Sequence, residues 1–448
     1  MNSRRDFLRK SAATVAGITI GGMGFPAKNY GRIMGANDRV RIGIVGFSDR
    51  ARYSLIPSFL GQAKHTNMEI VAVSDIWNRR RDEAKVYFDA KDVKVELFKN
   101  NEELYDSGQT DGVIISTADF QHALHLKEAV LAGQDVYVEK PFAETMADAR
   151  EALDAAKKSN RIIQIGSQRR SGSNYHAANK FIKSGKFGKI VSVEMTWNVN
   201  QPGRWRRPDL TSTIQESDTD WKRYLMNRPF EPWDPRKYVE YRLFWPYSSG
   251  IPGQWMCHQI DTVHWFTGLP HPRSVSANGG IYLWNDGRRN FDTMTAVFDY
   301  GPLDKKGEGF QVVYSSRQTN SAGGVKEIYY SNGGSLNLAT NMVTPAGGLQ
   351  EKHASAMGME PYLLDEHELP KEKIVTAADT GADSMTTLHM RDWMDCIRTR
   401  KETNAPIEAG YNHSIAGIMT TAALHTGKRV TFDEASQEVM AGDEVFRY

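Results

Sequence analysis

The stretch DVYVEKP at residues 135–141 decides the fold. Its first four residues predict a buried parallel strand, and Glu139-Lys140-Pro141 ends that strand. A lysine at the carboxyl end of such a strand lies where open α/β sheets bind ligands. Burial would lower the pKa of its ammonium group and allow proton exchange near neutral pH. The alternative is a surface lysine in a turn where Pro141 merely stops the strand.

The sequence around this stretch alternates between strands and helices. Helices are predicted at 121–131 and 146–159, each between two apolar runs. This alternation is typical of α/β proteins with a doubly wound parallel sheet. The predicted strands are residues 40–45, 68–75, 111–117, 135–138 and 162–166.

The loop after the first strand is a modified dinucleotide-binding motif. In the usual G-x-G-x-x-G pattern, glycines permit a tight turn and close approach of a pyrophosphate. Here Gly46 is kept, whereas Ser48 and Ala51 occupy the other two glycine positions. Asp75 ends the second strand, where an acidic residue binds ribose hydroxyls and repels a 2′-phosphate, so NAD is expected over NADP. The arginines at 79–81 could soften that preference, and Asp75 could instead cap the next helix.

The second half of the chain has a different texture. Residues alternate between apolar and polar along several stretches, which predicts a large, mostly antiparallel sheet in an α+β domain. A segment rich in aromatic and basic residues, 201–249, interrupts these strands. It is either a cap packed on the sheet or a platform that binds sugar faces and hydroxyls or a carboxylate. The alternating stretches are 191–197, 274–283, 293–300, 310–316 and 327–338.

Composition and the N-terminus narrow the functional classes. The chain has 448 residues with 56 Lys+Arg against 54 Asp+Glu, so charge gives no case for nucleic acid. Its two cysteines make no disulfide framework, no metal site is indicated, and no membrane span is expected in the mature protein. SRRDFLRK at 3–10 precedes a short apolar run and resembles a twin-arginine signal. Export of the folded protein to the periplasm is therefore expected, the alternative being a basic tail.

Three motifs resemble the glucose–fructose oxidoreductase, inositol dehydrogenase and rhizopine-catabolism (Gfo/Idh/MocA) family. They are TADFQH at 117–122, AGQDVYVEKP at 132–141 and HQID at 258–261, and the resemblance runs from about residue 40 to 433. The family usually has Pro where Ala118 stands. The twin-arginine motif implies a signal segment at 1–35. The family resemblance implies a homo-oligomer and three further segments: an NAD(P)-binding Rossmann domain at 36–165, an α+β domain at 166–380, and C-terminal helices at 381–448 that pack back near the Rossmann domain.

The resemblance also implies the site. Lys140 and His258 are the expected catalytic residues, acting on the hydroxyl proton as hydride leaves. Many relatives carry Asp four residues before this histidine, whereas Gln254 stands here and could orient the ring only by a hydrogen bond. His258 is therefore expected to be a weaker base. The expected cofactor-binding residues are Gly46, Phe47, Ser48, Arg50, Asp75, Thr117, His122, Glu139 and Lys140, and the expected substrate-binding residues are Arg170, Trp205, Arg242, Gln254 and Asp261.

Two enzyme classes and one binding class follow from these features. The first is an NAD(P)-dependent oxidoreductase that moves a hydride between a sugar, glycoside or cyclitol hydroxyl and a tightly bound nicotinamide. The second is an exported NAD-dependent glycosidase or lyase that works by transient oxidation at C3 and elimination, similar to glycoside hydrolase family 109. The third is a sugar-binding module without catalysis, against which the retention of both Lys140 and His258 argues.

Overall fold

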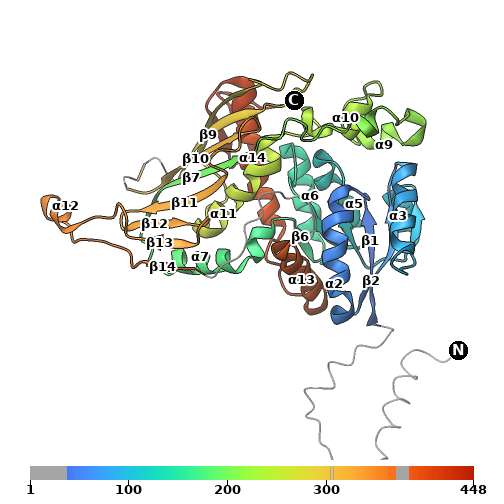
Figure 1. Cartoon of the computed structure of the whole chain (residues 1–448), viewed down its shortest axis with the longest axis horizontal. Coiled ribbons are helices and arrows are strands. Elements are labelled where there is room, and N and C mark those ends of the chain that lie inside the picture. The colour runs from blue at the N-terminus through green and yellow to red at the C-terminus, as the bar shows by residue number, and fades with distance from the viewer. Residues whose placement is uncertain (1–37, 303, 306, 370–382, 448) are drawn as a thin grey trace, which may run out of the picture. The chain divides into compact units, whose positions relative to one another are not determined.

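The computed structural model describes residues 38–302, 304–305, 307–369 and 383–447. The predicted signal at 1–35 lies outside these residues. From Val40 onward the chain forms two sheets with helices around and between them (Figure 1).

The first sheet is parallel throughout and confirms the predicted doubly wound fold. Its strand order is β3-β2-β1-β4-β5-β6. Successive strands are therefore added on one side of β1 up to β3 and on the other side from β4 onward. Alternate residues of the strands enter different cores: Val113 and Val136 pack on one face, and Ile114 and Tyr137 pack on the other. The strands are β1 (Val40–Val45), β2 (Met68–Ser74), β3 (Glu96–Phe98), β4 (Gly112–Ile115), β5 (Asp135–Val138) and β6 (Ile163–Ile165).

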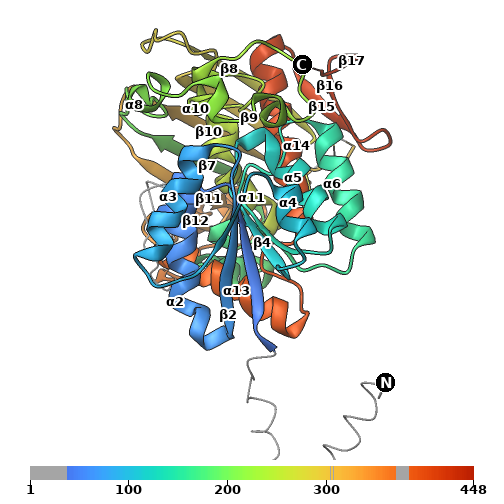
Figure 2. The same cartoon turned by 90° about the vertical axis from the view of Figure 1, so that its right-hand side faces the viewer.

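Helices cover both faces of this sheet. Figure 2 shows α2 and α3 on one side and α5 and α6 on the other. Two of the helices begin at side-chain caps, since Asn100 accepts a hydrogen bond from the Glu103 amide and Thr145 accepts one from the Asp148 amide. The helices of this half are η3 (Ala51–Leu55), α2 (Ile56–Thr66), α3 (Asn78–Asp89), α4 (Asn101–Asp106), η4 (Asp119–Gln121), α5 (His122–Leu131) and α6 (Met146–Lys158).

The second sheet has eleven strands and is mostly antiparallel, as predicted. Its order is β14-β13-β12-β11-β7-β10-β9-β8-β15-β16-β17, and β7 and β10 are its parallel pair. The stretch 327–338 was expected to be one strand and is two, because Ser331 pairs with Gly334 across a turn at 332–333. The strands are β7 (Ile190–Asn198), β8 (Ser274–Gly280), β9 (Thr293–Tyr300), β10 (Phe310–Arg317), β11 (Val325–Ser331), β12 (Gly334–Asn337), β13 (Met342–Thr344), β14 (His367–Glu368), β15 (Val430–Asp433), β16 (Glu438–Ala441) and β17 (Glu444–Val445).

The C-terminal region is only partly helical. Helix α13 (Ser384–Thr399) places Trp393 and Met394 in the core of the parallel sheet, and α14 (Ile407–Thr426) packs against α6, α11 and β8. The sequence predicted helices to the end of the chain. Instead, residues 430–445 form β15–β17, because Val430 is buried opposite Val275 and extends the edge of the large sheet.

The remaining helices connect these layers. Among the described residues, no helix has the length and apolar character needed to cross a membrane. The connecting helices are η5 (Gln168–Ser171), α7 (Ser173–Lys183), α8 (Pro208–Thr211), η6 (Glu216–Asp218), α9 (Trp221–Leu225), α10 (Pro235–Val239), η7 (Tyr241–Leu243), η8 (Pro252–Met256), α11 (Cys257–Thr267) and α12 (Glu351–Ala356).

Candidate functional site

A cavity of about 450 Å³ opens at the carboxyl ends of four parallel strands. Its walls include Val45 and Ser74, which end β1 and β2, and Ser116 and Glu139, which directly follow β4 and β5. Residues from 204 to 255 cover it. The cavity therefore lies at the point where the strand order reverses, which is where doubly wound sheets bind ligands.

The loop after β1 keeps glycine where the backbone requires it. Gly46 has a φ of +86°, and a Cβ there would lie 2.8 Å from both the Ser116 carbonyl oxygen and the Thr117 Cγ2. Ser48, which departs from the usual motif, bonds through its hydroxyl to the Ser116 hydroxyl at 2.7 Å. The serine thus ties the loop to the end of β4 while both residues line the cavity.

Asp75 lines the cavity and fixes the same loop. Its Oδ2 accepts a hydrogen bond from the Phe47 amide at 2.8 Å, and its Oδ1 accepts one from the Trp77 amide at 2.9 Å. Burial raises the pKa of Asp75. The cap residue of α3 is Trp77, and the Phe47 side chain is fully buried in the core. Selection of NAD by Asp75 stays a prediction.

Among the described residues, the buried Thr117 Oγ1 and His122 Nε2 of the cavity wall have no hydrogen-bond partner. The His122 Nδ1 donates to the Pro141 carbonyl oxygen at 2.7 Å, and burial lowers the pKa of His122, so the ring is neutral and its Nε2 is an acceptor. The Thr117 hydroxyl and the His122 Nε2 can therefore bond to a ligand, and Gly46 lets that ligand approach the backbone closely. These features fit a nicotinamide dinucleotide.

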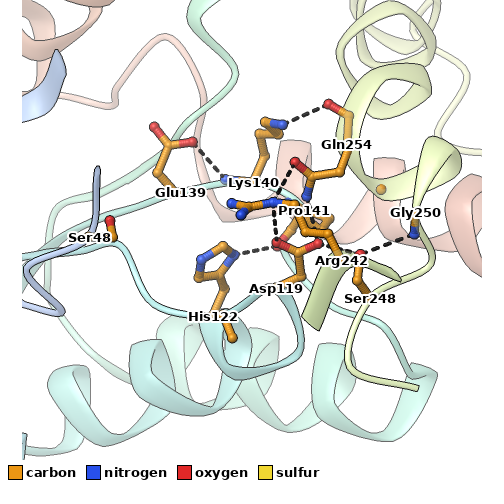
Figure 3. Close-up of polar contacts among 12 residues, drawn as sticks. Ser48, Asp119, His122, Glu139, Lys140, Pro141, Arg242, Ser248, Gly250 and Gln254 are labelled. Carbon is orange, nitrogen blue, oxygen red and sulfur yellow. Dashed lines mark hydrogen bonds and ion pairs between the residues drawn. The ribbon is translucent and has the colours of Figure 1, made fainter. Parts of the chain in front are cut away.

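Glu139 and Lys140 form the end of β5 as predicted. The buried Glu139 Oε1 accepts from the Arg50 Nε at 2.9 Å; burial opposes its ionisation, but Arg50 and then Lys140 hold the pKa of Glu139 below its ordinary value. The Lys140 Nζ donates to the backbone carbonyl oxygen of Gln254 at 2.7 Å (Figure 3). Burial lowers the pKa of Lys140, in the expected direction.

The Gln254 side chain turns toward Asp119 and not toward His258. Its Nε2 donates to the Asp119 Oδ2 at 2.6 Å, and its Oε1 accepts from the Arg242 Nε at 3.1 Å (Figure 3). The expectation that Gln254 orients the histidine ring is therefore wrong. Residues 252–256 form a π-helical turn, which is wider than an α-helical turn and does not align residues four apart.

His258 lies deeper than expected. It stacks on Trp197 with ring centroids 5.8 Å apart, and the walls of the cavity, as far as the described residues form them, do not include it. Burial and then the charges of Lys140 and Arg169 lower the pKa of His258 far below its ordinary value. The pKa of the ring is therefore low because of burial and nearby positive charges, and not because Gln254 faces it. The catalytic role of His258 stays a prediction.

Arg170 and Asp261 bind each other. The Arg170 Nε and Nη2 donate to the two carboxylate oxygens at 2.8 and 2.9 Å, and both side chains are buried. The pair joins η5 to α11 and lies outside the lining of the cavity described here. Its predicted role in substrate binding therefore has no support from this placement.

The aromatic segment 201–249 was predicted to be either a structural cap or a sugar-binding platform, and different residues of the segment fit each interpretation. Trp221 and Tyr247 are buried in a small core with Phe120 and act as a cap. Trp205, Tyr241 and Arg242 line the cavity, as a sugar-binding wall requires. Sequence reasoning did not assign Arg204, Asp119 or Trp255 to the site. Asp119 lies inside the motif at 117–122 and Trp255 lies three residues before the motif at 258–261, but only the three-dimensional contacts give them a role.

Among the described residues, no three His, Cys, Asp or Glu side chains gather as a metal site would require. The Cys257 thiol is buried and its pKa is raised by that burial to about 12, so it is no nucleophile.

Fold and cavity together define a dinucleotide-binding Rossmann protein. Residues 40–167 match the family model GFO_IDH_MocA, described as "Oxidoreductase family, NAD-binding Rossmann fold".

Known proteins share this fold. Inositol 2-dehydrogenase of Agrobacterium fabrum is 30% identical over 216 residues, which are 47% of this chain and 59% of that protein, so the chain spans little more than half the length of this relative. A levoglucosan dehydrogenase, solved in complex with NADH and levoglucosan, aligns with a TM-score of 0.63 at 14% identity over 88% of this chain and 99% of its own. The WlbA dehydrogenase of Bordetella pertussis, in complex with NADH and UDP-GlcNAcA, aligns with a TM-score of 0.62 at 16% identity over 88% and 98%.

Glu144 provides a test of the buried surroundings of the site. Its Oε1 accepts from the Ser249 amide at 3.0 Å, and burial, followed by the charge of Asp119, raises the pKa of Glu144 to about 8. The stability that its protonated form supplies is complete below the unfolded pKa of about 4.3 and is lost as pH rises through about 8. We expect Glu144→Gln to have the same thermal midpoint as the wild type near pH 4.5 and a higher one at pH 8. At pH 8 its free energy of unfolding should be larger by a few kcal/mol.

The control is Glu151→Gln, which changes an exposed carboxylate on the neighbouring helix. Thermal unfolding of the three proteins from pH 4.5 to 9 gives the comparison. A difference between Glu144→Gln and wild type that stays constant across that range would contradict the assigned protonation.

Proposed function

We propose that this protein is an NAD(P)-dependent oxidoreductase that transfers a hydride between a hydroxyl of a sugar, glycoside or cyclitol and a tightly bound nicotinamide. The observation that carries the proposal is the partly buried Lys140 amine just after β5, on a wall of the cavity shared by the strand ends and the aromatic segment. The relatives named as inositol and levoglucosan dehydrogenases support the substrate class.

Lys140 takes the hydroxyl proton in this account. Its pKa is lowered by burial, which increases the fraction of neutral amine that can accept a proton. The Gln254 carbonyl oxygen holds the Nζ in place through one hydrogen bond. NAD, when bound, supplies the hydride acceptor. Gly46, Asp75, Thr117 and His122 would hold the dinucleotide through the groups described above.

His258 is the second catalytic candidate and a weaker one. Its Nε2 is buried and has no partner among the described residues, so a neutral imidazole is available behind Lys140. Trp205 and Tyr241 would cover the apolar face of the sugar ring.

The N-terminus supports two further proposals. Arg4-Arg5 followed by Phe7-Leu8 supports export of the folded protein to the periplasm through the twin-arginine route. Free nicotinamide is not expected there, so a bound cofactor would have to be recycled. This favours the second candidate function, an NAD-dependent glycosidase or lyase working by transient C3 oxidation.

Self-association as a homo-oligomer also stays a prediction.

Lys140→Met tests the reaction. Removal of a proton-transfer group typically lowers turnover by roughly 10²–10⁴-fold. We expect a loss of this size for Lys140→Met while NADH binding, measured by fluorescence, persists. The control is Lys127→Met, which removes a solvent-exposed lysine of α5 that pairs with Glu151.

The same assay separates the candidates. Reduction of bound NAD by sugars or cyclitols supports the oxidoreductase, and cleavage of aryl glycosides without added cofactor supports the glycosidase. Near-normal turnover of Lys140→Met in either reaction would remove Lys140 from the mechanism, and the same outcome for His258→Ala would remove His258.

The export proposal has its own test. We expect a variant with both Arg4→Lys and Arg5→Lys to accumulate in the cytoplasm, because the twin-arginine route reads the adjacent arginines. Cell fractionation of the full chain in its native host measures this. Unchanged export of the double variant would contradict the proposal.

A further inference from the structure

The wall of the cavity contributed by residues 204–255 is cationic. This segment is described throughout, and its lining residues include four arginines but no aspartate or glutamate. The arginines are Arg204, Arg207, Arg223 and Arg242. A cluster of one sign on a ligand-binding wall is informative because it sets the charge of what the cavity accepts.

Two of these arginines are bound to carboxylates of the nucleotide-binding half. Arg207 pairs with Asp49 at 2.5 Å, and Arg223 pairs with Glu102 at 2.8 Å. These pairs hold the covering segment onto the parallel sheet.

The other two arginines lie around Lys140. The Arg242 Nε donates to the Gln254 side chain, and the backbone of the same Gln254 accepts from the Lys140 Nζ (Figure 3). The Arg204 guanidinium lies over the ring of Trp255, 5.4 Å from its centroid. Gln254 and Trp255 are adjacent in the chain and both line the cavity, so three cationic groups converge on one part of its wall.

Carboxylates that could receive sugar hydroxyls lie elsewhere. Within the described residues, the carboxylates that line the cavity are Asp49, Asp75 and Glu139, all from the nucleotide-binding half. Glu139 is bound to Arg50, and both Asp75 oxygens accept backbone amides. The strand-end loop between these groups is the expected pyrophosphate position, which is distinct from the wall around Gln254.

Asp119 stabilises this wall from behind. Its Oδ1 lies 4.0 Å from the Arg242 Nε, but the side chain is only 1% exposed. Its Oδ2 accepts hydrogen bonds from Ser248 and Gln254. Asp119 therefore positions Gln254 and Arg242 and does not reach a ligand in the cavity.

A wall built this way offers mainly hydrogen-bond donors. A neutral sugar presents hydroxyl donors that need acceptors, whereas a carboxylate presents acceptors only and forms its strongest hydrogen bonds with guanidinium groups. We propose that the substrate is a sugar acid, a hexuronate or an aldonate. Its carboxylate binds Arg242 and Arg204, and its carbinol faces Lys140. This assignment rests on the proposed function and specifies its substrate class.

The test measures binding without requiring turnover. Trp205 and Trp255 line the cavity, so quenching of tryptophan fluorescence reports occupancy in the NADH-loaded protein. Three hexuronates (glucuronate, galacturonate and mannuronate), gluconate, the methyl esters of the uronates and the matching neutral hexoses are titrated. We expect at least one acid to bind at least about tenfold more tightly than its ester and its neutral hexose, a difference of about 1.4 kcal/mol.

Variants of the two arginines test which side chain binds the substrate carboxylate. Arg242→Gln should lower affinity for the acid about tenfold or more and leave the affinity for the ester nearly unchanged, because it removes a charged hydrogen bond. Arg204→Gln serves as the second variant, and Arg429→Gln, an exposed arginine paired with Asp299, as the matched control. Thermal unfolding and NADH binding verify that the variants fold.

The outcomes separate the two proposals. Tight binding of an acid without reduction of NAD would support the sugar-acid site and contradict the oxidoreductase. Neutral hexoses that bind as tightly as every acid, or that reduce NAD more efficiently, would overturn the sugar-acid assignment and leave the oxidoreductase standing. Equal loss of acid and ester affinity in Arg242→Gln would also overturn it.

Discussion

The hydrogen bond from the Lys140 Nζ to the Gln254 carbonyl oxygen is the contact on which the site depends. It joins the end of a parallel strand to the π-helical turn that begins α11, and so links the nucleotide-binding half to the half that covers it. A buried ammonium is costly unless it is hydrogen bonded, and burial lowers its pKa. In the proposed reaction, the same burial that requires this contact also favours the neutral amine that would accept the proton.

The polar groups around this contact form a connected set. Asp119 holds the Gln254 amide, the amide holds Arg242, and Ser248 completes the carboxylate's hydrogen bonds. On the other side, Arg50 neutralises Glu139, which precedes Lys140 in the chain. Buried networks of this kind stabilise one geometry when every member is bonded. The network thus positions one amine and one guanidinium on the same wall of the cavity.

The sequence predicted the parts of the site that follow from strand topology. Short apolar runs located β1, β2, β4 and β5, and parallel strands must end at one edge, so Gly46, Asp75 and Lys140 come together without knowledge of any contact. The prediction that Gln254 orients His258 was wrong for two reasons. It assumed α-helical spacing where the chain makes a wider turn, and the actual partner of Gln254, Asp119, lies 135 residues away in the sequence. Arg170 and Asp261, 91 residues apart, pair for the same non-local reason. The C-terminal strands depend on a free sheet edge at β8, which local sequence does not reveal.

We infer that the strand-end cavity binds NAD with Asp75 at the ribose position. To test this, the purified protein is incubated with equal amounts of NAD and NADP, desalted and denatured, and the released nucleotide is identified by mass spectrometry. We expect NAD to be recovered in excess over NADP, and Asp75→Ala to reduce this excess. Recovery of NADP in preference to NAD, or of neither nucleotide, would contradict it.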